Sequence, residues 1–213
     1  MSSVSVKVCG ITRLEDASLA LELGAKKLGF ILHSKSPRRI KFEDIGRFKT
    51  ELPLKTKQMV AVEVAPEIES VQEMFDQGFG HFQFHFPYNL PRKLIEKWTE
   101  IISAENLWLA PQLPAGVDFP EDLLCFANTF LLDAYSEDKF GGTGICSDWD
   151  KFSSLQKSFC SKKWILAGGL SPQNIQLALN STDAQIVDVN SGVEKSPGVK
   201  DSQKLERLFS KIS

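Results

Sequence analysis

The stretch VSVKVCGITRLEDASLALELGAKKLGFIL, residues 4–32, contains a strand–helix–strand unit. Its first residues alternate valine with more polar side chains. Apolar β-branched residues at every second position are typical of a strand. After Gly10, apolar residues recur at helical spacing as far as Gly24, which suits a helix end. The apolar run KLGFIL then predicts a second strand. The first strand ends on a thiol, Cys9, with a glycine directly after it.

The same alternation of strand and helix patterns continues along the whole chain. Strands are predicted at 4–9, 27–32, 57–64, 79–86, 106–113, 129–134, 163–169 and 184–192, and helices at 12–27, 41–52, 66–78, 90–102, 120–128, 148–159, 171–180 and 201–212. Strict alternation predicts a parallel sheet covered by helices, an α/β fold. Eight pairs match a (β/α)8 TIM barrel. An open, doubly wound sheet is the alternative, because periodicity does not show closure.

Composition excludes several classes of protein. The 213 residues are 42% hydrophobic and 24% charged, with a net charge of -2 and no basic block of the kind that binds nucleic acid. No apolar run reaches the roughly 20 residues that span a membrane, and we expect that the first residues are not a signal peptide, because they lack a charged segment followed by an apolar one. The four cysteines and three histidines lack metal-site spacing. We therefore expect a cytoplasmic protein, one domain over residues 1–213, without metal, and a monomer or homodimer.

Several polar residues fall where strands end, and in a barrel those ends form the active-site mouth. Cys9 is either a small buried apolar residue or a reactive thiol. Asp133 closes a strongly apolar strand, so its carboxylate must be paired or functional. Arg38 is either a solvated loop charge or a fork for a carboxylate. His85 shares a strand face with Gln83, and a lone strand histidine is more often a structural hydrogen-bonding group than a base.

Three glycine-rich turns follow the last three strands: GGTG at 141–144, AGG at 167–169 and NSG at 190–192. Each glycine alone could simply make a tight turn. Glycine also lets backbone N–H groups approach an anion closely, and the helix N-terminus that follows adds positive potential. Barrel enzymes often hold a phosphate near the seventh and eighth loops. Three such turns in neighbouring loops therefore favour a phosphate site.

Five motifs, read together and in order, resemble the phosphoribosylanthranilate isomerase family of tryptophan biosynthesis. They are VKVCGITRLEDA, GFILHSKSPRRI, LLDA with GGTG, ILAGGLSPQNI and VDVNSGVEKSPGVKD. The resemblance runs from Lys7 to the last helix and is weak between about residues 50 and 124. It implies a (β/α)8 barrel that performs an Amadori rearrangement, by general acid–base catalysis and without a cofactor, on a small phosphorylated substrate.

The resemblance also implies a role for each matching residue. The base falls on Cys9 and the acid on Asp133, while Arg38 falls on the arginine for the substrate carboxylate. His85 and Asp188 fall on further substrate-binding positions. The phosphate ligands fall on Gly142, Gly144, Gly168, Gly169, Ser191 and Gly192.

Four residues depart from the family pattern: Glu63 replaces an aromatic residue, Phe86 a glycine, Ile145 a lysine, and Asn190 a serine. Strand parity predicts that Glu63 faces the barrel interior together with Lys7 and Cys9. A lone interior carboxylate is costly, so we expect it to pair with Lys7, unless it lies high enough to meet solvent or Arg38.

Two other functions are compatible with parts of the sequence. A related histidine-pathway isomerase would need two catalytic aspartates and a twofold repeat, and neither fits. A degenerate barrel that binds a phosphorylated ligand as a sensor, without turnover, agrees with the altered middle strands. The presence of both Cys9 and Asp133 favours the enzyme.

Overall fold

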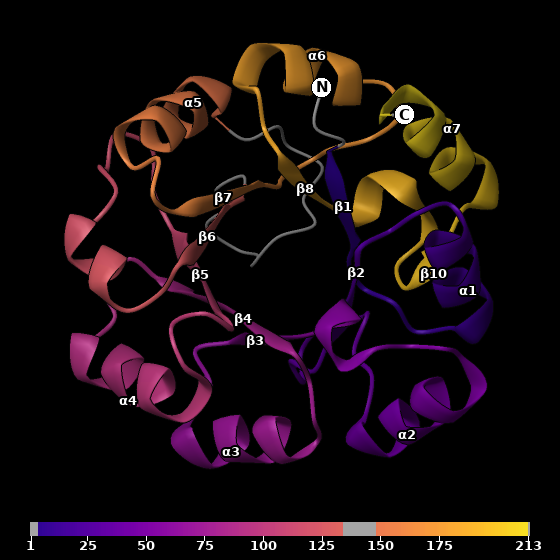
Figure 1. The fold of residues 1–213 in the computed structure, drawn as a ribbon, viewed down its shortest axis with the longest axis horizontal. Coiled ribbons are helices and arrows are strands. Elements are labelled where there is room, and N and C mark those ends of the chain that lie inside the picture. Colours follow the sequence, from indigo (N-terminus) through magenta and orange to yellow (C-terminus); the bar gives the residue numbers. More distant parts are fainter. Residues whose placement is uncertain (1–3, 134–147, 213) are drawn as a thin grey trace.

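A closed parallel barrel forms the centre of the molecule in the computed structural model, which describes residues 4–133 and 148–212 (Figure 1). Its strands are β1 (Ser5–Val8), β2 (Lys27–Ile31), β3 (Met59–Val64), β4 (His81–Pro87), β5 (Leu107–Gln112), β6 (Thr129–Leu132), β7 (Lys163–Leu166) and β8 (Ile186–Val189). They pair in chain order, and β8 pairs with β1. The sheet is therefore closed, which confirms the predicted barrel over the open sheet.

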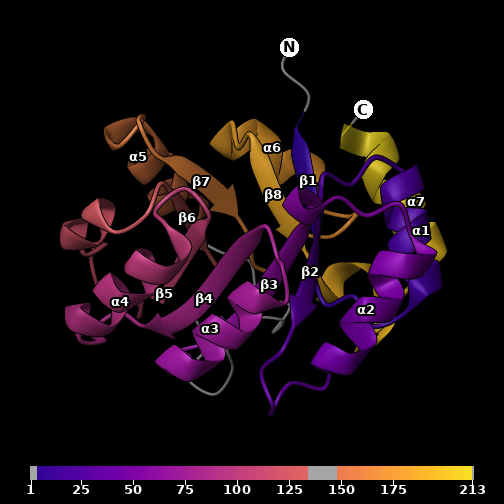
Figure 2. The ribbon, with the colours of Figure 1, turned by 60° about the horizontal axis from the view of Figure 1, so that its bottom comes forward.

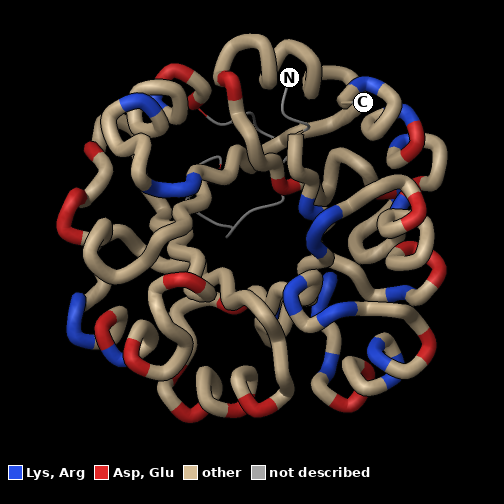
Figure 3. Tube along the Cα trace, in the orientation of Figure 1, with Lys and Arg blue, Asp and Glu red and all other residues tan. Residues whose placement is uncertain are grey.

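Helices surround the barrel (Figures 1 and 2). They are α1 (Leu14–Glu22), α2 (Phe42–Glu51), α3 (Ile68–Asp76), α4 (Arg92–Ile102), α5 (Trp149–Ser158), α6 (Ile175–Thr182) and α7 (Ser202–Ile212), with the 3₁₀ helices η1 (Thr56–Gln58), η2 (Glu121–Cys125) and η3 (Ser191–Val193). The short helix expected at 120–128 is η2. Charges of both signs are interspersed around this ring (Figure 3). Within the described ranges, no helix is long and apolar enough to cross a membrane.

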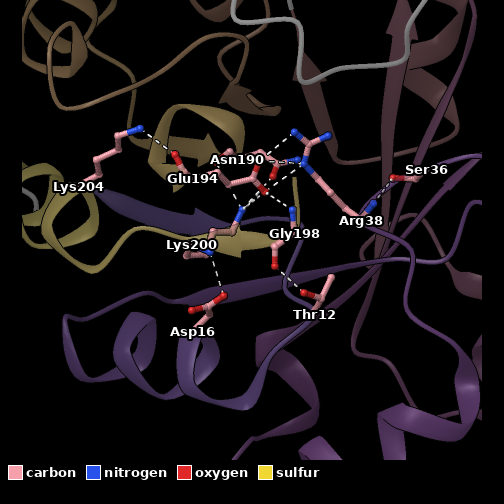
Figure 4. A network of polar contacts seen from close by, with 9 residues as sticks. All are labelled: Thr12, Asp16, Ser36, Arg38, Asn190, Glu194, Gly198, Lys200 and Lys204. Carbon is pink, nitrogen blue, oxygen red and sulfur yellow. Dashed lines mark hydrogen bonds and ion pairs between the residues drawn. The ribbon is translucent and has the colours of Figure 1, made fainter. Parts of the chain in front are cut away.

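A two-stranded antiparallel hairpin, which the periodicity did not predict, follows β8. Its strands are β9 (Glu194–Ser196) and β10 (Val199–Lys200). Pro197 and Gly198 make the turn between them, and Gly198 has a φ of +81°, a conformation that glycine adopts without a steric penalty. The hairpin places two charged residues, Glu194 and Lys200, near the first strands of the barrel (Figure 4).

The larger apolar core lies between the strands and the helices. Its strand residues include Phe84 and Phe86, both fully buried. Trp98 of α4 packs edge-on against both rings, with centroid distances of 5.0 and 5.8 Å. Phe86, one of the four departures, thus points away from the barrel interior, and its bulk fills the layer under α4.

A second apolar cluster fills the barrel interior, and it corrects the predicted orientation of β3. Cys9, Val60 and Val62 belong to this cluster, whereas Ala61 belongs to the outer core. Glu63 alternates with Val62 and therefore faces outward, where its Oε1 lies 2.7 Å from Nδ1 of His33. The expected pair between Glu63 and Lys7 is wrong. Both faces of β3 are covered, so its sequence does not reveal which face points inward.

A tight backbone approach at Gly80 gives a test of this packing. An alanine Cβ there would lie 2.4 Å from the Thr56 carbonyl oxygen, so Gly80→Ala should lower the free energy of unfolding by roughly 1–3 kcal/mol. Gly46→Ala is the matched control, because no atom lies within 4 Å of its added methyl group inside α2. The control should gain about 0.5–1 kcal/mol. Urea denaturation measures both, and equal stabilities would contradict the packing.

Candidate active site

The carboxyl ends of the strands bring most of the predicted site residues to one end of the barrel. Cys9 directly follows β1, Asp133 directly follows β6, and Arg38 lies in the loop after β2. Cys9 is buried and Asp133 is half-buried. His85 and Asp188 lie within β4 and β8, while Gly168, Gly169, Ser191 and Gly192 follow β7 and β8. Gly142, Gly144 and Ile145 lie outside the described residues.

Gly29 of β2 provides the space in which the Cys9 thiol and the Lys7 side chain meet. A Cβ at Gly29 would lie 2.7 Å from Sγ of Cys9 and 3.0 Å from Nζ of Lys7. Both side chains point into the barrel from β1, because Val6 and Val8 pack in the outer core. The absence of a side chain at Gly29 therefore lets a thiol and an ammonium group share one site.

The Lys7 ammonium group is paired with Asp188. Its Nζ donates to Oδ2 of Asp188 over 2.8 Å, the Lys7 side chain is 0% exposed, and the two residues are opposite each other in the β1–β8 register. The other oxygen, Oδ1 of Asp188, is buried without a hydrogen-bond partner among the described residues, as is Oε1 of Gln83. Burial raises the pKa of Asp188, and the Lys7 ammonium group and the Gln83 side chain oppose that effect.

Burial and neighbouring charges shift the pKa values of Cys9 and His85 in the barrel interior. Burial raises the pKa of the Cys9 thiol, the Lys7 ammonium group lowers it in part, and the Asp188 carboxylate raises it. Burial also lowers the pKa of His85 to about 3, helped by Lys7 and His33. His85 is therefore neutral at physiological pH, and its Nε2 lies 2.8 Å from Nε2 of Gln83, the face-sharing neighbour. The amide nitrogen of Gln83 can only donate, so Nε2 of His85 accepts this hydrogen bond, and the neutral ring supplies no positive charge.

A charged network, not predicted from the sequence, surrounds Arg38 (Figure 4). Nε and Nη2 of Arg38 donate to the Glu194 carboxylate, with distances of 3.0 and 2.8 Å to Oε1 and Oε2. Lys200 Nζ lies 3.0 Å from the same carboxylate and 2.9 Å from Oδ1 of Asn190. The turn residues Pro197 and Gly198 could have predicted the hairpin that contains Glu194 and Lys200. They could not have predicted that the hairpin contacts Arg38.

The electrostatics of Cys9 give a signed prediction. Asp188→Asn removes the carboxylate that raises the Cys9 pKa, so thiolate should form at lower pH. The rate of Cys9 alkylation by iodoacetamide, followed by peptide mass spectrometry against pH, should then have a lower midpoint. Asp150→Asn, an exposed aspartate on α5, is the matched control and should leave the midpoint in place. An unchanged or higher midpoint in Asp188→Asn would refute this electrostatic account.

Comparison with known proteins places this site in a family. A family model described as N-(5'phosphoribosyl)anthranilate (PRA) isomerase matches residues 6–211. The N-(5'-phosphoribosyl)anthranilate isomerase of Citrifermentans bemidjiense is 38% identical over 210 residues, which cover 96% of this chain and 94% of the relative.

Solved structures agree with the sequence comparison. Phosphoribosyl anthranilate isomerase from Thermus thermophilus is 31% identical, with a TM-score of 0.81 and 98% of each chain covered. A phosphoribosyl anthranilate isomerase in complex with reduced 1-(o-carboxyphenylamino)-1-deoxyribulose 5-phosphate is 30% identical, with a TM-score of 0.77 and the same coverage. The chain therefore belongs to the N-(5'-phosphoribosyl)anthranilate isomerase family.

Proposed function

We propose that this chain isomerises N-(5'-phosphoribosyl)anthranilate to 1-(o-carboxyphenylamino)-1-deoxyribulose 5-phosphate in tryptophan biosynthesis, with Cys9 as the base and Asp133 as the acid. Membership of the isomerase family supports the reaction. The observation that supports the residues is a buried thiol beside a buried ammonium group at the barrel mouth, with a carboxylate ending another strand. The enzyme acts in the cytoplasm.

The reaction needs two proton transfers on different sides of one substrate. The Asp133 carboxyl group donates a proton to the furanose ring oxygen as the bond from that oxygen to C1 breaks, which gives an iminium group. Cys9 then removes the proton from C2, and the resulting enolamine tautomerises to the ketone. One proton enters and one leaves, so the product is an isomer. Positioned groups of this kind typically contribute 10²–10⁴-fold each.

Lys7 is the group that makes Cys9 a usable base. A thiolate buried among apolar side chains is unfavourable, and burial accordingly raises the pKa of Cys9. The Lys7 ammonium group, which lies beside Gly29 together with the thiol, opposes that effect. Cys9 must be a thiolate to take the proton from C2, so the charge of Lys7 has to offset part of the effect of burial.

The remaining residues bind the two anionic ends of the substrate. Arg38 binds the anthranilate carboxylate. Backbone groups at Gly168, Gly169, Ser191 and Gly192 bind the phosphate, together with Gly142 and Gly144. Gly168 and Gly169 have φ values of +89° and +62°, which side chains disfavour. A Cβ at Gly192 would lie 2.0 Å from the Leu170 carbonyl oxygen, so the last two loops pack closely enough to share one anion.

Cys9→Ser should keep the fold and lose about 10²-fold or more in kcat. Serine packs in the same space, but its hydroxyl is a far poorer base at neutral pH. Turnover is followed by the loss of substrate fluorescence, and a thermal melt checks folding. A loss of less than about tenfold would exclude Cys9 as the base, and binding without turnover in the unaltered chain would favour a sensor.

Asp133→Asn should abolish turnover while leaving affinity for the product within about tenfold, because an amide keeps the shape but is not an acid. Isothermal titration with the reduced product analogue measures the affinity. Asp122→Asn, an aspartate of η2 that pairs with Arg92 on the outer surface, is the matched control and should retain full turnover. Normal turnover in Asp133→Asn would show that another group is the acid.

A further inference from the structure

We infer that Glu194 is a positioning residue: it fixes the guanidinium group of Arg38 for the substrate carboxylate, and the hairpin β9–β10 thereby sets the preference for a carboxylated substrate. The inference rests on the proposed role of Arg38 and deepens it. Glu194 itself does not need to touch the substrate, because its carboxylate is occupied by Arg38 and by the hairpin (Figure 4).

The contact between Glu194 and Arg38 is a two-point ion pair on one edge of the guanidinium group. Nε and Nη2 donate to the carboxylate, and the side chains of Arg38 and Glu194 are only 12% and 4% exposed. A guanidinium group has five N–H donors in a rigid fork. The edge formed by Nη1 and Nη2 remains for a second carboxylate, and within the described part of the chain Nη1 donates to no other group. One carboxylate therefore orients Arg38 while the other edge can bind a ligand.

Glu194 is itself held in place by its own hairpin. The Lys200 ammonium group lies 3.0 Å from Oε1, and the backbone N–H of Gly198 donates to the same oxygen over 3.2 Å. Lys200 is 0% exposed on its side chain and is anchored further by Asn190. Such a framework removes rotamer freedom from Arg38 before the ligand arrives, which lowers the entropic cost of binding.

The charges of this network favour an anionic ligand. Burial alone would raise the pKa of Glu194, but Arg38 and Lys200 together hold that pKa below its usual range. Glu194 is therefore ionised at neutral pH. Burial lowers the pKa of Lys200, and Glu194 opposes that effect. With both cations ionised, the three side chains in direct contact carry two positive charges and one negative charge, an excess of one positive charge. A single carboxylate on the substrate matches that excess.

The test compares two probes that differ only in the carboxylate. They are reduced 1-(o-carboxyphenylamino)-1-deoxyribulose 5-phosphate and the same molecule with an unsubstituted phenyl ring, and titration calorimetry gives the ratio of their Kd values. Glu194→Gln should shrink this ratio roughly tenfold, through loss of affinity for the carboxylated probe alone. Lys204→Met is the matched control: the Lys204 ammonium group donates to the backbone oxygen of Glu194, over 2.7 Å, rather than to its carboxylate, so the variant should leave the ratio unchanged.

Two further variants keep the outcome decisive. Glu194→Asp retains the charge but shortens the side chain, so it should also reduce the ratio. It replaces Glu194→Gln as the test if that variant does not fold. Arg38→Met should remove most of the preference. If Arg38→Met leaves the ratio unchanged, the proposed role of Arg38 fails. If Arg38→Met reduces the ratio but folded Glu194 variants leave it unchanged, or weaken both probes equally, the positioning role of Glu194 alone is overturned.

Discussion

The ion pair between Lys7 and Asp188 is the interaction on which the site depends. It joins the first and last strands of the barrel, where Lys7 and Asp188 face each other in register. Removing two charges from water is costly, and a buried pair is seldom kept for stability alone. Here the pair lies beside the Cys9 thiol, with Gly29 leaving the room for both side chains. Closure of the barrel thus holds a positive charge beside Cys9, the base that we propose.

The second charged network supports the same mouth from the outside of the first strands. Glu194 links Arg38 of the loop after β2 to Lys200 of the hairpin, and Lys200 also contributes to lowering the pKa of Cys9. In the proposed mechanism the two networks have different tasks: the interior pair tunes Cys9, the proposed base, and the hairpin network orients Arg38, the proposed carboxylate-binding group. Both use buried lysines, which are costly unless paired and therefore fix geometry when they are.

Most of the architecture follows from local sequence patterns, because each strand–helix unit has its own hydrophobic periodicity and its own glycine or proline residues at the ends of its elements. The strand patterns also predicted that Cys9 and Asp133 follow strands at one end of the barrel, since parallel strands in a barrel bring their ends together. The inward face of β3 could not be predicted: MVAVEV is covered on both sides, so alternation is lost and Glu63 was placed inside. The partner of Arg38 was also missed. That partner, Glu194, lies 156 positions away in the sequence, and only folding brings it next to Arg38.

A crystal structure of this chain with reduced 1-(o-carboxyphenylamino)-1-deoxyribulose 5-phosphate tests the central claim most directly. We expect Sγ of Cys9 to lie within about 3.5 Å of the C2 carbon, on the opposite side of the sugar chain from Asp133. The Lys7 ammonium group should remain beside Sγ. A bound analogue whose C2 lies next to His85 or Asp188, with Cys9 out of reach, would contradict the assignment of Cys9 as the base.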